Sequence, residues 1–382
     1  MRNAIVFFLA LATAAGCAPF VPGPQGDEEE VTAEREVRNI ILMIADGTGV
    51  GAWTAAKYAN DRLAVTRMPV VGLVDTRSAM HKVTDSAAGA SVYASGQRTV
   101  NRTISVGPAT ACPFPQAGDP HEWPAGCEPL RTWFEVARDK GRGTGIVTTT
   151  FVVDATPAAF VAHSPSRYWP DEIAEQVAGF GLDVLLGGGA RHFAAGTRAD
   201  GRDLLGEMCR RGRCLGTARD LETYRPDDKP LVGLFAGGDM DELEERPVSL
   251  PAMVSAALDK LDRHPDGFVA MFETEATDNA AHANAPLERV TADLLEFDRA
   301  VAVALEFASR RPGTLLIVTA DHETGGFSLI ETGNDFELRY ADRGHSAAMV
   351  PLFAIGPRSE RFGGLRENHE IGQTLLEIVR AW

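Results

Sequence analysis

The stretch Ile40-Ile41-Leu42-Met43-Ile44-Ala45 is an uninterrupted apolar run, and Asp46 follows it at once. A run of this kind is typical of a strand buried on both faces of a sheet. Two further apolar runs also end in potential metal ligands: Phe268–Phe272 before Glu273, and Leu315–Ala320 before Asp321 and His322. Ligands of open α/β sheets bind beyond the carboxyl ends of the strands. The sequence therefore predicts a metal site at this edge, and divalent metals held by Asp and His favour hydrolytic chemistry.

Strand-like and helical segments alternate along the chain. Strands are expected at Val70–Val74, Gly145–Thr149, Leu182–Leu186, Val232–Phe235, Phe268–Phe272, Leu315–Thr319 and Val350–Ile355, and helices include Ala252–Leu261 and Leu287–Ala308. This alternation predicts an α/β fold, a three-layer α/β/α sandwich around a central, largely parallel sheet. We expect one domain over residues 37–382, with the proline-rich segment 107–129 as an inserted surface loop.

Composition excludes some classes of function. The chain has 382 residues, a formal net charge of -16 and a pI near 5.0. No nucleic-acid-binding surface is expected, because such surfaces are basic. An anionic substrate would need local positive charge to offset the overall field.

The first residues predict export. Arg2 precedes a short apolar stretch, and small residues then lead to Cys17. We interpret residues 1–16 as a lipoprotein-type signal peptide that leaves Cys17 as a lipid-anchored N-terminus. Ordinary signal cleavage is the alternative, because Ala14 stands where a lipoprotein signal usually has Leu. Residues 17–36, acidic and rich in proline, are expected to form a disordered tether. The expected location is the periplasm, or a membrane anchor that faces the periplasm or the cell exterior.

The other four cysteines are Cys112, Cys127, Cys209 and Cys214. An even number in an exported chain suggests two disulfides. Pairing of nearest neighbours would close two loops, although the sequence leaves the other two pairings and a zinc site open. No CxxC spacing supports zinc.

A small-residue segment contains the candidate nucleophile. Ser86 lies in Asp85-Ser86-Ala87-Ala88, at the start of an expected helix. A helix N-terminus attracts anions, which would favour a phosphate beside this serine. Helix capping by Asp85 or Ser86 is the simpler interpretation of the segment alone.

Other segments offer ligands and an anion clamp. Asp278 and His282 are four residues apart and would share one helix face, whereas Glu275 is out of phase and expected to be solvated. Asp154 and Thr156 supply hard oxygens that suit Mg²⁺. Arg167, downstream of Thr156, has a guanidinium that can grip two phosphate oxygens, and His345 adds an imidazole before the last strand.

Together these motifs closely resemble the alkaline phosphatases, from about Asn39 to the C-terminus. The resemblance rests on Asp-Ser-Ala-Ala at Ser86, Asp-Ala-Thr-Pro-Ala-Ala with Arg167 downstream, Leu-Gly-Gly-Gly at 186–189, Glu-x4-Asp-x3-His at 273–282 and Ala-Asp-His at 320–322. It implies a phosphate monoester hydrolase of broad substrate range. Together with the expected export, this chemistry suggests phosphate scavenging.

The resemblance also implies a role for each site residue. Ser86 would become phosphorylated, and Arg167 would bind two phosphate oxygens. Two Zn²⁺ and one Mg²⁺ are implied, with the following ligands: Asp278, His282 and His345 for one zinc; Asp46, Asp321 and His322 for the second; Asp46, Asp154, Thr156 and Glu273 for magnesium. Two successive displacements would retain configuration at phosphorus.

Two departures from the family pattern matter. Asn279 stands where many relatives have Lys or His contacting phosphate through water, which predicts weaker binding of product phosphate. Only 22 residues separate His322 from His345, so surface elaborations that build dimer contacts can be missing, and a homodimer is an expectation of the family only.

The same motifs argue against two other functions. A phosphodiesterase or sulfatase of the same superfamily typically has Thr, or a modified Cys or Ser in Cys-x-Pro-x-Arg, as its nucleophile. A phosphate- or zinc-binding protein without activity would have lost the nucleophile, the arginine or a ligand, and none is lost here.

Overall fold

A computed structural model describes residues 36–112, 122–240, 242–333 and 335–382. The predicted signal peptide, Cys17 and the tether up to residue 35 lie outside the described residues. In the described part, no helix is long and apolar enough to cross a membrane.

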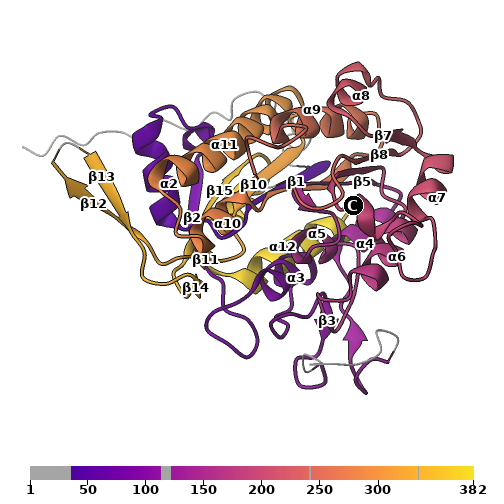
Figure 1. Ribbon diagram of the computed structural model, residues 1–382, viewed down its shortest axis with the longest axis horizontal. Coiled ribbons are helices and arrows are strands. Elements are labelled where there is room, and N and C mark those ends of the chain that lie inside the picture. Colours follow the sequence, from indigo (N-terminus) through magenta and orange to yellow (C-terminus); the bar gives the residue numbers. More distant parts are fainter. Residues whose placement is uncertain (1–35, 113–121, 241, 334) are drawn as a thin grey trace, which may run out of the picture.

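A ten-stranded sheet forms the centre of the molecule (Figure 1), with strand order β16-β2-β15-β10-β1-β9-β5-β6-β8-β7. In that order the bounds are Gly364–Glu367, Val70–Asp75, Val350–Ile355, Thr314–Thr319, Asn39–Ala45, Phe268–Thr274, Gly143–Phe151, Val184–Gly188, Leu231–Leu234 and Arg213–Leu215. Only β15 runs antiparallel to its neighbours, β10 and β2. The predicted largely parallel sheet is confirmed, and every predicted strand overlaps an observed one.

Helices cover both faces of the sheet, so the predicted three-layer sandwich is also confirmed. Alternate residues of β1 point to opposite layers: Ile40, Leu42 and Ile44 join one core cluster, while Ile41 and Met43 join the other. The first layer holds α3 (Ser86–Ser95), α4 (Trp133–Asp139), α5 (Ala155–Ala158), α6 (Pro170–Phe180), α7 (Leu204–Arg211) and α12 (Asn368–Arg380). The second holds α2 (Val50–Ala59), α8 (Ala218–Thr223), α9 (Leu250–Leu261), α10 (Ala276–His282) and α11 (Leu287–Arg310).

Short elements complete the fold. A hairpin of β12 (Ser328–Thr332) and β13 (Asp335–Arg339) extends from the body at the left of Figure 1. β11 (Glu323–Thr324) pairs with β14 (His345–Ser346), and β3 (Val106–Gly107) pairs with β4 (Glu128–Pro129) at the base of the predicted surface loop. Single helical turns are η1 (Ala64–Arg67), η2 (Ala190–His192) and η3 (Ser359–Phe362).

Both nearest-neighbour disulfides are present. Cys112 bonds to Cys127 across 15 residues, and Cys209 bonds to Cys214 across 5. The two longer-range pairings and the zinc alternative, which the sequence left open, are thereby excluded.

Candidate active site

Parallel pairing places the predicted ligands at one edge of the sheet. β1 lies between β9 and β10, with Ala45 opposite Thr274 and Ile44 opposite Thr319. Asp46, whose amide donates to the Thr274 carbonyl at 2.9 Å, therefore emerges at the end of β9 on one side and beside the segment Ala320–His322 on the other. Gly47, which follows, has φ +69°, and a Cβ there would lie 2.5 Å from Asp278 Oδ1. Only glycine allows the chain to pass this close to the next ligand.

Asp46, Asp321 and His322 form the first cluster, and all three are buried. His322 Nε2 lies 3.4 Å from Asp46 Oδ1 and 3.2 Å from Asp321 Oδ2. Neither of those two buried oxygens has a hydrogen-bond partner in the described structure. Two buried carboxylate oxygens facing one ring nitrogen match the donor set of a divalent cation.

The electrostatics of this cluster favour a cation. Burial raises the pKa of Asp46 well above its usual value, and the charges of Asp321 and Asp278 raise it further. Burial likewise raises the pKa of Asp321 to about 7. Burial lowers the pKa of His322, so its ring is neutral and keeps a lone pair for a metal. The cluster thus fits a divalent ion that would offset the cost of burying these acids.

Asp278, His282 and His345 form the second cluster. His282 Nε2 lies 3.1 Å from Asp278 Oδ2 and 3.1 Å from His345 Nε2. The predicted shared face of Asp278 and His282 is confirmed. Burial raises the pKa of Asp278, but the hydrogen bond with His282 and the charges of the histidines lower it more, to about 2. The hydrogen bond with Asp278 raises the pKa of His282 to about 8.

One threonine joins the two clusters. The Thr324 hydroxyl donates to Asp278 Oδ1 and lies 3.2 Å from His322 Nδ1. The rings of His322 and His345 stack with centroids 3.6 Å apart. No sequence pattern points to Thr324, because a threonine two residues after His322 looks the same as an ordinary strand residue.

Ser86 is the first residue of α3 and faces the first cluster. The Asp85 side chain caps the helix by accepting from the Ala88 amide at 3.1 Å. Ser86 is therefore free of the capping role, and its Oγ lies 3.2 Å from His322 Nε2. The capping alternative is confirmed for Asp85 alone.

Arg167 is held between two carboxylates in the same region. Its Nη1 lies 3.3 Å from Asp85 Oδ2, and its Nη2 lies 2.9 Å from Asp154 Oδ1. Burial lowers the pKa of Arg167, but the charges of Asp154 and Asp85 raise it more, so the guanidinium stays charged. A fixed planar cation is suited to gripping two oxygens of a phosphate.

The residues expected to bind magnesium are partly assembled. Thr156 Oγ1 lies 3.2 Å from Asp46 Oδ2, and Thr148 donates to Glu273 Oε2 at 2.6 Å. Burial raises the pKa of Glu273, whereas hydrogen bonds with Thr148 and Thr156 lower it. Asp154, by contrast, binds Arg167 and caps α5 through the Ala155 amide at 2.7 Å. Three of the four predicted ligands thus converge, while the Asp154 carboxylate faces the arginine.

A cavity of about 640 Å³ opens over these groups, and Ser86, Arg167 and both histidines of the second cluster line it. Asn279, which is exposed, lines it too. Glu275 was expected to be solvated, and this is wrong: it is half-buried, it lines the cavity and one carboxylate oxygen is buried. The cause is its position at the N-cap of α10, where its amide donates to Thr149 Oγ1 at 3.1 Å.

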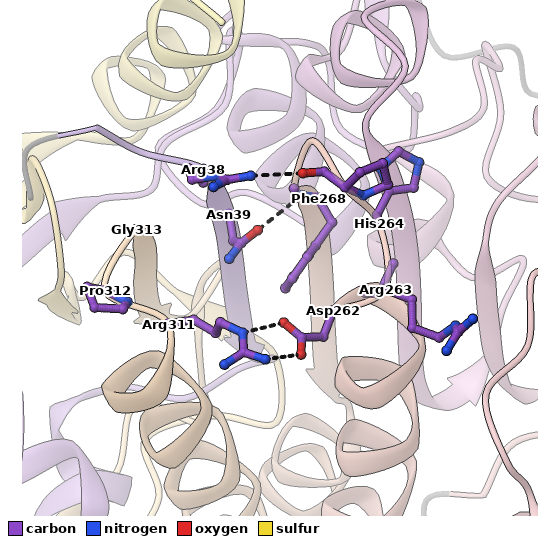
Figure 2. A pocket seen from close by; sticks show the side chains of 12 residues that line it. Arg38, Asn39, Asp262, Arg263, His264, Phe268, Arg311, Pro312 and Gly313 are labelled. Carbon is purple, nitrogen blue, oxygen red and sulfur yellow. Dashed lines mark hydrogen bonds and ion pairs between the residues drawn. The ribbon is translucent and has the colours of Figure 1, made fainter. Parts of the chain in front are cut away.

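A second cavity of about 290 Å³ lies at the amino-terminal edge of the sheet, away from these groups. Figure 2 shows two hydrogen bonds between Arg311 and Asp262: Nε donates to Oδ1 at 2.7 Å and Nη2 donates to Oδ2 at 2.5 Å. Arg38 donates to the Pro265 carbonyl at 2.8 Å. This cavity therefore offers no cluster of groups like the one at the opposite edge.

Comparison with known proteins identifies the family. The family model "Alkaline phosphatase" matches residues 37–338. Streptomycin-6-phosphate phosphatase of Streptomyces griseus is 33% identical, with 90% of each chain covered. Alkaline phosphatase 3 of Bacillus subtilis is 31% identical over 94% of this chain and 93% of its own.

Solved structures agree. Alkaline phosphatase from the Antarctic bacterium TAB5 has a TM-score of 0.79 and 29% identity, covering 91% of this chain and 98% of its own. A variant of that enzyme, with TM-score 0.78 and 28% identity, was solved with Mg bound in its M3 site. This chain belongs to the alkaline phosphatase family and is a metal-dependent phosphoric monoester hydrolase.

Proposed function

We propose that the enzyme cleaves phosphate monoesters through a covalent phosphoserine on Ser86. The observation that carries the proposal is the Ser86 hydroxyl, 3.2 Å from His322 Nε2 in the wall of the cavity that Arg167 also lines. Asp85 relieves the serine of capping, so its oxygen faces the cavity at the positive end of the α3 dipole. Such a serine suits attack on a phosphorus atom whose charged oxygens Arg167 holds.

Two zinc ions and one magnesium ion complete the proposed site. The clusters Asp278–His282–His345 and Asp46–Asp321–His322 each offer the mixed nitrogen and oxygen donors that zinc accepts. Asp46, Asp154, Thr156 and Glu273 offer only oxygens, which suits magnesium. When bound, these ions would stabilise the serine alkoxide, the leaving oxygen and the attacking water.

The reaction then has two displacements that the protein groups organise. Arg167 orients the nonbridging oxygens of the substrate while Ser86 Oγ forms a bond to phosphorus and the bond to the alcohol oxygen breaks. Water next attacks phosphorus from the side the alcohol left, the bond to Ser86 Oγ breaks, and the serine recovers its proton. Inversion at each step gives net retention.

The test is hydrolysis of p-nitrophenyl phosphate by the purified protein with Zn²⁺ and Mg²⁺, from neutral to alkaline pH. We expect rapid, EDTA-sensitive turnover that Ser86→Ala nearly abolishes. Ser91→Ala, which removes another buried hydroxyl of α3, is the matched control and should stay active. Acid quenching during turnover should leave a phosphate on the Ser86 peptide, and an unmodified peptide would exclude the covalent intermediate.

The same assay separates sister activities. Bis-p-nitrophenyl phosphate and p-nitrophenyl sulfate serve as the diester and sulfate substrates. Preference for either one over the monoester would move the protein to a phosphodiesterase or sulfatase activity on the same fold. Bound zinc without any turnover would instead support a binding protein.

Metal content tests the proposed stoichiometry. Elemental analysis of the loaded protein should give two zinc and one magnesium per chain. Asp154→Ala should lower magnesium and leave zinc unchanged, because Asp154 belongs to neither histidine cluster. Retained magnesium would remove Asp154 from the ligand set.

We further propose that the enzyme works outside the inner membrane, where it releases phosphate for uptake. The N-terminal sequence and the two disulfides support export. Labelling with a fatty-acid precursor should mark the protein, and Cys17→Ser should remove the label and release the protein from membranes. A soluble, unlabelled periplasmic protein would favour ordinary signal cleavage. Dimer formation remains a proposal that sedimentation would test.

A further inference from the structure

The triple glycine at 187–189 positions a turn that the chemistry above does not use. This turn, η2, carries Arg191 and His192. Gly189 has φ +89°, and a Cβ there would lie 2.5 Å from the Phe151 Cβ. Glycine thus lets the turn lie directly against the carboxyl end of β5.

The position of the turn is fixed by backbone hydrogen bonds. The amides of Gly189, Ala190 and Arg191 donate to the carbonyls of the loop after β8, at 2.7, 2.9 and 3.3 Å. Buried Arg198 also donates to the His192 carbonyl, at 2.9 Å. The side chains on η2 therefore extend from a supported base rather than from a free loop.

Arg191 and His192 line the same cavity as Ser86, together with Phe151 and Tyr168. They also line an adjoining cavity of about 460 Å³ that continues past Trp169 and Pro170. The cavity at Ser86 thus continues past η2 into a longer depression. The alcohol part of a bound monoester would extend along it toward η2.

Arg191 presents an unneutralised cation in this depression. Its Nε donates to His192 Nε2 at 3.2 Å, and its guanidinium carbon lies 5.6 Å from the centre of the Phe151 ring. Arg191 forms no ion pair within the described part of the chain. Burial lowers the pKa of His192, the charge of Arg191 lowers it further, and the ring is therefore neutral. With Nε engaged, the four N–H groups on the two terminal nitrogens remain for a ligand.

The acids of the same cavity are engaged elsewhere. Asp85 and Asp154 bind Arg167, and the charge of Glu275 acts on Arg167 as well. Asp278 belongs to the second cluster. Asp171, which faces His192 Nδ1 at 3.8 Å, also faces Arg198 at 3.9 Å. Arg198 also pairs with Glu175 and Asp200, so its charge is matched, whereas Arg191 has no such partner among the described residues.

We infer that Phe151, Arg191 and His192 form a leaving-group subsite that favours monoesters whose alcohol carries a second anionic group on an aromatic or similarly flat frame. Phe151 and Tyr168 offer ring surfaces to the frame. Arg191 binds the anion, a carboxylate or a second phosphoryl group, and His192 is a positioning residue that holds the Arg191 fork. The inference rests on the proposed monoesterase function and specifies its substrate class.

The experiment compares aryl phosphates that differ at the para position. Phenyl phosphate is neutral there, 4-carboxyphenyl phosphate and hydroquinone bisphosphate carry an anion, and 4-(aminomethyl)phenyl phosphate carries a cation. The readout is kcat/KM for each charged substrate divided by kcat/KM for phenyl phosphate. The ratio cancels differences in the amount of folded enzyme, and comparison between variants cancels intrinsic reactivity.

In Arg191→Ala we expect the anion ratios to fall roughly fivefold from wild type, the upper range for a solvent-exposed ion pair. The cation ratio should rise. Arg191→Lys should keep part of the anion preference, and the preference should shrink as salt approaches 1 M, where charges are screened within about 3 Å. Arg219→Ala, which removes an exposed charge on α8, is the matched control and should leave every ratio unchanged.

One result would refute the subsite, and a different result would refute the proposed function. If wild type and Arg191→Ala give the same ratios while phenyl phosphate is hydrolysed in a Ser86-dependent way, the subsite is refuted and the proposed function stands. If phenyl phosphate itself is not hydrolysed, the proposed function fails. The larger of the two anion ratios identifies whether carboxylate or phosphoryl is preferred.

Discussion

Neutralising Asp85 should weaken phosphate binding without unfolding the helix that it caps. Asp85 Oδ1 accepts from the Ala88 amide at 3.1 Å, while Oδ2 faces Arg167 Nη1 at 3.3 Å. Asp85→Asn keeps an acceptor oxygen for the cap, and Asn and Asp are about equally good N-cap residues. It places an NH₂ group opposite the arginine, which then keeps only its contact with Asp154.

The size of the effect follows from these contacts. Unit charges 3.3 Å apart attract by about 5 kcal/mol at an effective dielectric constant of about 20, before desolvation is subtracted. The side chains of Arg167 and Asp85 are 17% and 16% exposed, and hydrogen bonds between charged groups contribute about 1.5–3 kcal/mol net. Because Asp154 still anchors the guanidinium, we expect about 1–2 kcal/mol to be lost, which is roughly a 5- to 30-fold rise in the inhibition constant for phosphate.

The assay is competitive inhibition by inorganic phosphate, with urea unfolding as the measure of stability. Asp203→Asn is the matched control, because Asp203 caps α7 through the Gly206 amide at 2.9 Å and is not among the residues that line the active-site cavity. An inhibition constant that falls in Asp85→Asn would refute the reasoning. It would mean that removing a negative charge near phosphate outweighs the loss of Arg167 positioning.

Three further predictions follow from the structure. Asn279→Lys should lower the phosphate inhibition constant up to about fivefold, because it adds an exposed cation to the cavity. Asn279→Gln is the control, and an unchanged constant in Asn279→Lys would contradict this account. Replacing both Cys112 and Cys127 with Ser should lower the free energy of unfolding by about 3 kcal/mol in urea titrations, since a loop of 15 residues is no longer closed, and an equal stability of the oxidised and substituted proteins would contradict it. Glu367 accepts hydrogen bonds from Arg98 and Arg77, which lower its pKa to about 2. Its contribution to stability should therefore be present above a pH of about 4.3, its pKa in the unfolded chain, and should be lost as the pH falls toward 2. In metal-free protein, the difference in unfolding free energy between wild type and Glu367→Gln should vanish over that range. A constant difference would refute the assignment.

The sequence alone determined the sheet and the location of the site. Runs such as Ile40–Ala45 are apolar at every position, and only a strand covered on both faces buries all of them. Ligands placed directly after such runs must then emerge at one edge, whatever the helices do. The family motifs assigned the individual roles, and the structure brings Asp46, Asp321 and His322 together as that pattern requires.

Tertiary structure decided what depends on contacts between segments remote in sequence. Asp85, not Ser86, caps α3, and Asp85 then pairs with Arg167, 82 residues away. Thr324 couples the two clusters, and Glu275 is half-buried because α10 begins beside β5. The Arg191 turn reaches the cavity only because a glycine lets it pass close to Phe151. Periodicity records which face of an element is buried, whereas these features depend on distances across the sheet edge that no local pattern encodes.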